Sequence, residues 1–243
     1  MPLFDILKSR SHLRLFLAST LALACFAAAA TSAEAASITI FKNTLKTSQG
    51  RKAVNQFSGR ANCDRGGSKE SFRTEVGKRT KECAYRTSLV GRDLAISVTG
   101  RLFKSTPKKV RRQAYLSVSL RHDLDGSRYQ LSVFPSGRRY QLKKVFANGK
   151  IQYFGKGKAG NTVGGMGEAN RLTLRAYNDQ KGNPSGSASV LAMVNGCKVA
   201  SALDPRGNLL EGRDSTFSIG NKNGARGARG SFVKLSIRIP DPI

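Results

Sequence analysis

The stretch AYLSVSLRHDLDGSRYQLSVFPSGRRYQLKKV, residues 114–145, decides the fold class of this sequence. Apolar and polar residues alternate with a period of two in each of its three apolar runs, as in half-buried β-strands. In the first run, Leu116, Val118 and Leu120 share one face. Turn-forming sequences at residues 122–126 and 135–137 separate the runs. We therefore expect three consecutive antiparallel strands here.

The same alternation recurs on both sides of this stretch, and no segment of useful length has a helical period. Asn195-Gly196 between two such runs is a strong hairpin signal. One apolar and one polar face on each strand predicts an all-β fold, a single jelly-roll β-sandwich of two antiparallel sheets, with a closed barrel as the alternative. Further expected strands are residues 37–41, 93–99, 151–154, 171–177, 187–194, 197–203, 215–219 and 232–239.

Residues 1–35 have the pattern of an export signal rather than of a folded segment. Lys8, Arg10 and Arg14 are followed by an apolar run at residues 15–30, and then by Ala33-Glu34-Ala35, a small–x–small cleavage pattern. The apolar run is shorter than the roughly 20 residues that cross a bilayer. We expect a signal peptide over 1–35 and one β-sandwich domain over 36–243. Lipidation at Cys25 is the alternative.

Three cysteines follow the expected cleavage site: Cys63, Cys83 and Cys197. Thiols oxidise outside the cytoplasm, so we predict a Cys63–Cys83 disulfide that closes a polar segment. Cys197 opens an expected strand, where it is either a half-buried thiol or the site of an intermolecular bridge. Without further Cys or His nearby, the spacing is not a zinc pattern.

From Ser88 onward, strand and turn motifs follow one another in a recognisable order. The residues that carry this order are 128–134 with 139–143, 170–175, Val194-Asn-Gly196 with Val199, 217–220 and 231–237. The order resembles that of the concanavalin A-like lectin/glucanase superfamily, particularly its laminin-G-like and 3-keto-disaccharide-hydrolase-like sandwiches in secreted bacterial proteins. The resemblance implies a sandwich that hosts lectins, hydrolases and passive modules, and no catalytic motif accompanies it.

Candidate catalytic and metal patterns are weak. Retaining glycosidases need two carboxylates roughly 5–5.5 Å apart, but we place nearly all acids in turns or loops. The segment 122–126 is better interpreted as a hairpin turn than as a calcium loop, because residue twelve from Asp123 is Phe134 rather than Glu. His122 is then a solvated turn residue. The glycine-rich segment 155–167 is interpreted as a flexible connection, and we expect no metal or cofactor.

The formal net charge of +27 is the feature of the sequence that most strongly indicates a negatively charged binding partner. Basic residues occupy positions expected to face outward, which favours contact with polyanions, although a generic basic surface explains them as well. With 7% aromatic residues and no Trp, the sequence does not favour a specific nucleic-acid reader. The predicted ligand-binding residues are Arg121, Arg128, Arg171, Arg175 and Tyr177.

Taken together, these features predict an exported, non-catalytic binding module that is secreted or associated with the cell envelope. The expected ligand is a carbohydrate or an anionic cell-wall or extracellular polymer. The alternative is a glycoside hydrolase-like enzyme of the same fold. A carboxylate pair would favour the enzyme, and a surface of Arg, Lys and Tyr would favour the binding module.

Overall fold

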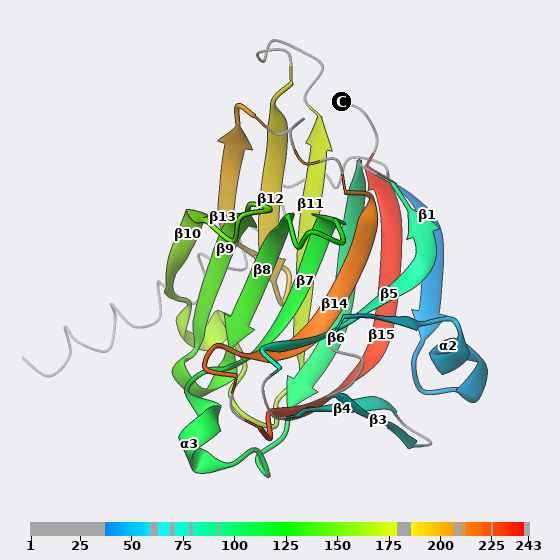
Figure 1. The fold of residues 1–243 in the computed structure, drawn as a ribbon, viewed down its shortest axis with the longest axis vertical. Helices are drawn as coiled ribbons and strands as arrows, with labels where there is room; N and C mark the ends of the chain where they lie inside the picture. The colour runs from blue at the N-terminus through cyan, green and yellow to red at the C-terminus, as the bar shows by residue number, and fades with distance from the viewer. Residues whose placement is uncertain are drawn as a thin grey trace, which may run out of the picture. The chain divides into compact units, whose positions relative to one another are not determined.

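The structure, a computed structural model, describes residues 37–58, 63–68, 71–77, 80–91, 93–178, 186–206, 210, 212–224 and 226–240. The predicted signal peptide and Cys25 lie outside the described residues. Fifteen strands fill most of the described part, and they form two antiparallel sheets that pack face to face (Figure 1). The predicted all-β sandwich of jelly-roll type is confirmed.

One sheet has eight strands and lies behind the other in Figure 1. The long C-terminal strand β15 is near its centre and also pairs with the N-terminal strand β1. In spatial order the strands are β13 (Cys197–Asp204), β12 (Ala188–Val194), β11 (Asn170–Asn178), β6 (Leu94–Leu102), β15 (Arg229–Pro240), β4 (Ser71–Val76) and β3 (Cys63–Ser68), with β1 (Ser37–Thr44) beside β15.

The other sheet has seven strands and contains the stretch that decides the fold. Its strands β7, β8, β9 and β10 are neighbours in both sequence and space, so the predicted consecutive antiparallel strands are confirmed. In spatial order the strands are β10 (Ile151–Lys158), β9 (Arg139–Val145), β8 (Arg128–Phe134), β7 (Ala114–His122), β14 (Asp214–Asn221), β5 (Glu82–Val90) and β2 (Asn55–Ser58).

Helical segments in the described part are short and lie in connections. They are α2 (Ser48–Lys52), α3 (Lys108–Arg111) and the 3₁₀ turns Pro135–Gly137 and Gly160–Thr162. Among the described residues, we find no helix with the length and apolar character needed to span a membrane.

The core lies between the sheets and follows the predicted alternation. The apolar positions of β7 are fully buried against the apolar positions of β6 and β11. Burying such side chains contributes about 1.5–3 kcal/mol each, which is the main force that holds the two sheets together. The residues at the centre of this core are Leu116, Val118, Leu120, Leu131, Val133, Ile96, Val98, Leu172 and Leu174.

Two local predictions from the cysteine and turn patterns are confirmed. Cys63 in β3 and Cys83 in β5 form a disulfide, which ties one sheet to the other. Asn195 and Gly196 both have positive φ, at 51° and 87°, as a tight two-residue hairpin turn requires. Cys197 begins β13 directly after this turn and is half-buried.

Two cations, Arg121 and Lys144, are buried between the sheets, and the sequence pattern had predicted an outward position for Arg121. Arg121 has a φ of 52°, a left-handed conformation that interrupts the alternation and turns its side chain inward. Its guanidinium lies 3.2 Å from an Asp93 carboxylate oxygen and donates to Asn178 at 2.9 Å. Lys144 occupies an inward position of β9, where its ammonium group forms a 2.7 Å ion pair with Asp204. The predicted outward placement of Arg121 is therefore wrong.

Candidate functional site

The outer face of the seven-stranded sheet is covered at its centre by short, uncharged polar side chains. These residues occupy the outward positions of β7, β8 and β14, yet their exposed fractions are only 0–1%. We expected the outward positions to be wet, because an antiparallel sheet commonly exposes one face to solvent. Buried polar residues concentrated on the outer side of a sheet form a layer of fixed hydrogen-bonding groups. They are Ser117, Ser119, Gln130, Ser132, Thr216 and Ser218.

Glu82 lies at the start of β5, and its carboxylate accepts hydrogen bonds from four neighbouring side chains. Its Oε2 accepts a charge-assisted hydrogen bond from Arg128 at 3.0 Å, and its Oε1 accepts from the Gln130 amide at 2.9 Å. The hydroxyls of Ser117 and Ser218 also donate to Oε1. These five residues, which we call the Glu82 cluster, come from four strands of the sheet.

The Glu82 carboxylate is held in its charged form. Burial alone would raise its pKa, but the charge of Arg128, the hydrogen bond from Ser218 and the nearby His122 and Lys143 together lower it below 4.5. A general acid at neutral pH needs a pKa raised toward 7, so the direction here is the opposite of that requirement. Glu82 is therefore a charged acceptor that the other four residues of the Glu82 cluster share.

His122 ends β7 beside the Glu82 cluster and is only 4% exposed, so its predicted place in a solvated turn is wrong. Its Nδ1 lies 2.8 Å from the Thr216 hydroxyl, and its ring packs on Phe57 with centroids 4.4 Å apart. Burial, reinforced by the charge of Arg128, lowers the pKa of His122 to about 3. The imidazole is neutral at physiological pH. The predicted turn itself follows, closed by a hydrogen bond from Gly126 N–H to the Asp123 carbonyl.

Four cations lie beside the Glu82 cluster, toward β9, β10 and the end of β14: Arg139, Lys143, Lys156 and Lys222, which we call the cationic cluster. Arg139 and Lys222 both lie over the Phe134 ring, at 5.4 and 4.9 Å from its centroid. Within the part of the chain that the structure describes, none of the four forms an ion pair. This end of the face therefore carries uncompensated positive charge.

The pKa values of Lys143 and Lys222 are lowered by burial and by the neighbouring positive charges. Burial, with the added repulsion of Arg128 and Lys222, lowers the pKa of Lys143 to about 8 even though Glu82 acts in the other direction. Burial together with the charges of Arg139 and Lys156 also lowers the pKa of Lys222. Cations that repel one another in this way attract an anion that neutralises them.

Several buried polar atoms on this face have no hydrogen-bond partner among the described residues. Ser132 and Gln141 are direct register partners on β8 and β9, and Gln130 is opposite Lys143. A buried polar atom without a partner costs about 1–3 kcal/mol, so these atoms leave an unmet demand for hydrogen bonds beneath this face. The atoms are Arg128 Nε, Gln130 Oε1, Ser132 Oγ and Gln141 Oε1.

The residues that we predicted to bind ligand are divided among three places. Arg128 belongs to the Glu82 cluster, whereas Arg121 is in the interior. Arg171, Arg175 and Tyr177 alternate with buried residues along β11 and share the outer face of the eight-stranded sheet. The structure therefore brings three of the five together, on the sheet opposite Arg128.

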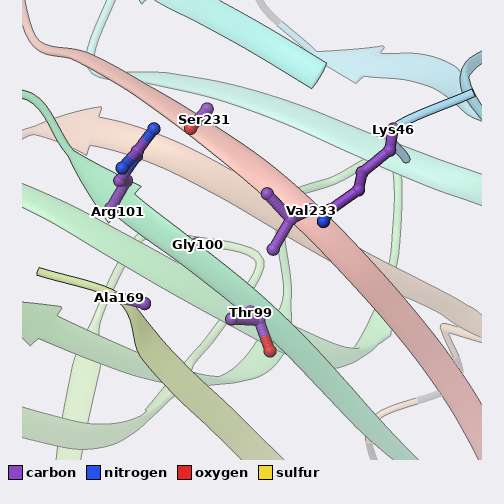
Figure 2. A pocket seen from close by; sticks show the side chains of 7 residues that line it. All are labelled: Lys46, Thr99, Gly100, Arg101, Ala169, Ser231 and Val233. Carbon is purple, nitrogen blue, oxygen red and sulfur yellow. The ribbon is translucent and has the colours of Figure 1, made fainter. Parts of the chain in front are cut away.

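Two pockets lie on the outer face of the eight-stranded sheet. One, of about 420 Å³, is lined by Tyr177 together with Ser189, Leu191, Ser201 and Leu203, among others. The other, of about 390 Å³, lies where β6 and β15 pair (Figure 2). Its lining residues are Lys46, Thr99, Gly100, Arg101, Ala169, Ser231 and Val233.

Sequence patterns alone did not identify the Glu82 cluster. We had placed most acids in turns and loops, whereas Glu82 begins a strand with Ala84 and Arg86 at the next outward positions. A signal was nevertheless present. The central outward positions 117, 119, 130 and 132 carry Ser or Gln, where a solvated strand would carry charged residues. Short uncharged polar residues at successive outward positions indicate a face that is buried or occupied.

Comparison with known proteins identifies the fold. No protein-family model and no curated protein matches the sequence. Among solved structures, the carbohydrate-binding module CBM66 from Bacillus subtilis has 15% sequence identity and a TM-score of 0.50, over 75% of this chain and 94% of its own. A β-glucanase from Bacillus licheniformis has 7% identity and a TM-score of 0.58, over 84% and 99%. Alginate lyase Aly36B has 9% identity and a TM-score of 0.53, over 84% and 96%.

The protein thus shares the β-sandwich fold of these structures, which is the fold that the strand and turn motifs predicted. At these identities the likeness is one of fold. The similar structures include a carbohydrate-binding module and carbohydrate-cleaving enzymes, so the fold does not by itself decide between binding and catalysis.

Proposed function

We propose that this protein is an exported binding module for an anionic polysaccharide, which lies along the outer face of the seven-stranded sheet. The observation that carries the proposal is the cationic cluster beside unpartnered buried polar atoms. Carboxylate or sulfate groups of the polymer would pair with Arg139, Lys143, Lys156 and Lys222. Sugar hydroxyls would supply a hydrogen bond to Gln141, a partly exposed member of the unpartnered set. The exposed ring of Tyr153 next to Lys156 adds a surface on which a sugar ring can pack.

Export is part of the same proposal. The signal pattern at residues 1–35, with cleavage after Ala35, supports a secreted or envelope-associated protein. The Cys63–Cys83 disulfide supports an oxidising compartment, where such bonds persist. An anionic wall or extracellular polymer is a ligand that a protein meets there.

A glycoside hydrolase of this fold is supported less well. Its two carboxylates would have to lie roughly 5–5.5 Å apart for a retaining reaction, and one of them would need a raised pKa. Although burial raises the pKa of Glu82, the charge of Arg128 and the hydrogen bond from Ser218, with the charge of Lys143, lower it below its ordinary value. Binding is therefore the function that this geometry supports best.

The first test is a triple substitution in the cationic cluster, Arg139→Gln with Lys143→Gln and Lys222→Gln. Affinity for polygalacturonate at low salt should fall by about tenfold or more for each of the three charges removed, because each lost charge-assisted contact is worth about 1.5–3 kcal/mol. Calorimetric titration at two salt concentrations measures this. Wild-type binding should weaken as salt rises, since screening shortens the range of exposed charges to about 8 Å at physiological ionic strength.

A matched control removes three exposed charges elsewhere, by Lys42→Gln, Lys52→Gln and Lys198→Gln. It should change the affinity much less than the cationic-cluster variant does. A second comparison, Arg171→Ser with Arg175→Ser, tests the other sheet. If that variant loses binding while the cationic-cluster variant retains it, the polymer lies on the eight-stranded sheet and our assignment is wrong. Equal binding to a neutral glucan at both salt concentrations would refute an anionic ligand.

Binding should also depend on pH through Lys143. With a pKa of about 8, this side chain loses its charge as the pH rises from 7 to 9. Affinity for the polyanion should fall over that interval, because a neutral amine no longer attracts it. Titrations at pH 7, 8 and 9 measure the effect. The single variant Lys143→Gln should lose the part of the pH dependence centred near pH 8, while Arg139→Gln keeps it. A flat profile in the wild-type protein would contradict the role of Lys143.

A further inference from the structure

The pocket on the outer face of the eight-stranded sheet has the chemistry of a second, separate anion site. It lies at an irregularity of β15, where the register with β6 shifts between Phe232 and Lys234. The chain after β1 contributes Lys46 to its wall, as Figure 2 shows. A register shift of this kind bends a strand and opens space between neighbouring side chains.

Positive charge surrounds this pocket. Lys46 and Arg101 line it, and neither forms an ion pair among the residues that the structure describes. Sheet register also places Lys234 and Arg171 on either side of the lining residue Thr99. An anion in the pocket would therefore lie within a field of several unneutralised cations.

The nearby carboxylates are already engaged elsewhere. Glu75, on β4, pairs with Arg229 at 2.8 Å. Glu168, next to the lining residue Ala169, accepts a hydrogen bond from the Gly165 backbone N–H at 2.7 Å. Within the described part of the chain, neither carboxylate forms an ion pair with Lys46 or Arg101.

Ser231 supplies an independent indication of a ligand. It lines the pocket, is 0% exposed, and its hydroxyl has no hydrogen-bond partner among the described residues. Sheet register places it directly between Arg73 on β4 and Arg101 on β6. Figure 2 shows the Ser231 hydroxyl beside the Arg101 side chain. Both guanidinium groups lie over the Phe103 ring, 5.8 Å from its centroid, so the two positive charges of Ser231's strand partners gather on the same ring. The unpartnered Ser231 hydroxyl can donate a hydrogen bond to an anion that these charges attract.

We propose that this pocket binds a tetrahedral oxyanion, such as a phosphate or sulfate group, through Arg101, Lys46 and the hydroxyls of Ser231 and Thr99. Planar guanidinium donors match the oxygens of such groups, and the ammonium adds charge without demanding a fixed geometry. The site does not depend on the function proposed above, because the two outer faces of a sandwich point in opposite directions. A molecule with both sites would hold two anionic groups at once.

The test is a calorimetric titration of the full chain with inorganic phosphate at constant low ionic strength, with sulfate and acetate as parallel arms. Saturable binding of phosphate or sulfate is expected, and the stronger of the two identifies the group. Arg101→Gln should weaken it by about tenfold or more. Lys198→Gln, an exposed charge on the edge strand β13 of the same sheet, should leave it unchanged.

Ser231→Ala separates a binding role from a structural one. Because the hydroxyl has no partner among the described residues, its removal should not lower the melting temperature without phosphate. It should reduce the rise in melting temperature that phosphate produces. An undiminished rise in Ser231→Ala, no saturable binding in the wild-type protein, or an equal loss in Lys198→Gln would each overturn the proposal. The Arg139, Lys143 and Lys222 triple variant should bind phosphate at this site normally. If this triple variant loses polygalacturonate but still binds phosphate, the two proposed sites are separate, and each proposal can fail without the other.

Discussion

Replacing Glu82 by glutamine should lower the free energy of unfolding by about 3–5 kcal/mol, the largest effect that we expect from a single substitution. Both partners of the Glu82–Arg128 pair are mostly buried, with side-chain exposures of 13% and 15%. Glutamine keeps the size of the side chain but leaves the Arg128 charge unpaired. It also places an amide donor among the donors of Ser117, Ser218 and Gln130.

Urea unfolding of the two proteins measures this difference, and a second carboxylate serves as the control. Glu75 pairs with Arg229, whose side chain is 44% exposed, so Glu75→Gln should cost no more than about 1 kcal/mol. The double variant Glu82→Gln with Arg128→Met should recover part of the loss, because the unpaired charge is then gone. If Glu82→Gln is as mild as Glu75→Gln, the Glu82 cluster does not hold the polar face together.

Breaking the Cys63–Cys83 disulfide should lower the free energy of unfolding by about 3 kcal/mol. The bond closes a loop with a sequence separation of 20, and the cross-link restricts the unfolded chain. It also joins β3 of one sheet to β5 of the other, so its loss acts on the contact between the sheets. Because Cys83 is fully buried, the suitable variant is Cys63→Ala with Cys83→Ala.

Thermal and urea unfolding with and without a reducing agent measure the effect. The double alanine variant should unfold at the same lower midpoint as the reduced wild-type protein, and reductant should not change it further. Cys197→Ser should remain sensitive to reductant, because it keeps the bond. An unchanged midpoint in the reduced wild-type protein would show that the packed sheets alone provide the stability.

Local sequence pattern was sufficient for the strands, the turns and the fold class. The alternation at Leu116, Val118 and Leu120 specifies which side of β7 enters the core, because a strand turns successive side chains to opposite faces. Asn195-Gly196 specifies a hairpin because those residues tolerate positive φ. These are properties of a few neighbouring residues, so no knowledge of the remaining chain is needed to infer them.

The same alternation failed where one residue left the regular strand conformation. Arg121 counts as an outward position in the sequence, but its left-handed backbone turns it into the interior, and His122 takes the outer face instead. Lys144 follows the alternation but ends in a buried pair with Asp204, which is distant in sequence. A charged side chain is stable in the interior only when an oppositely charged group pairs with it. The sequence alone does not show which distant residue supplies that group.

The candidate site was decided by tertiary structure alone. A period of two separates inner from outer positions, but it does not say which strands become neighbours or which sheet a strand joins. Glu82 and Ser218 are 136 residues apart and meet because β14 pairs with β5. The same pairing order places Lys143 beside this cluster and Arg171 on the opposite sheet. Residue type and spacing therefore determine that the surface is basic and polar, whereas strand order determines which of its charges gather into a site.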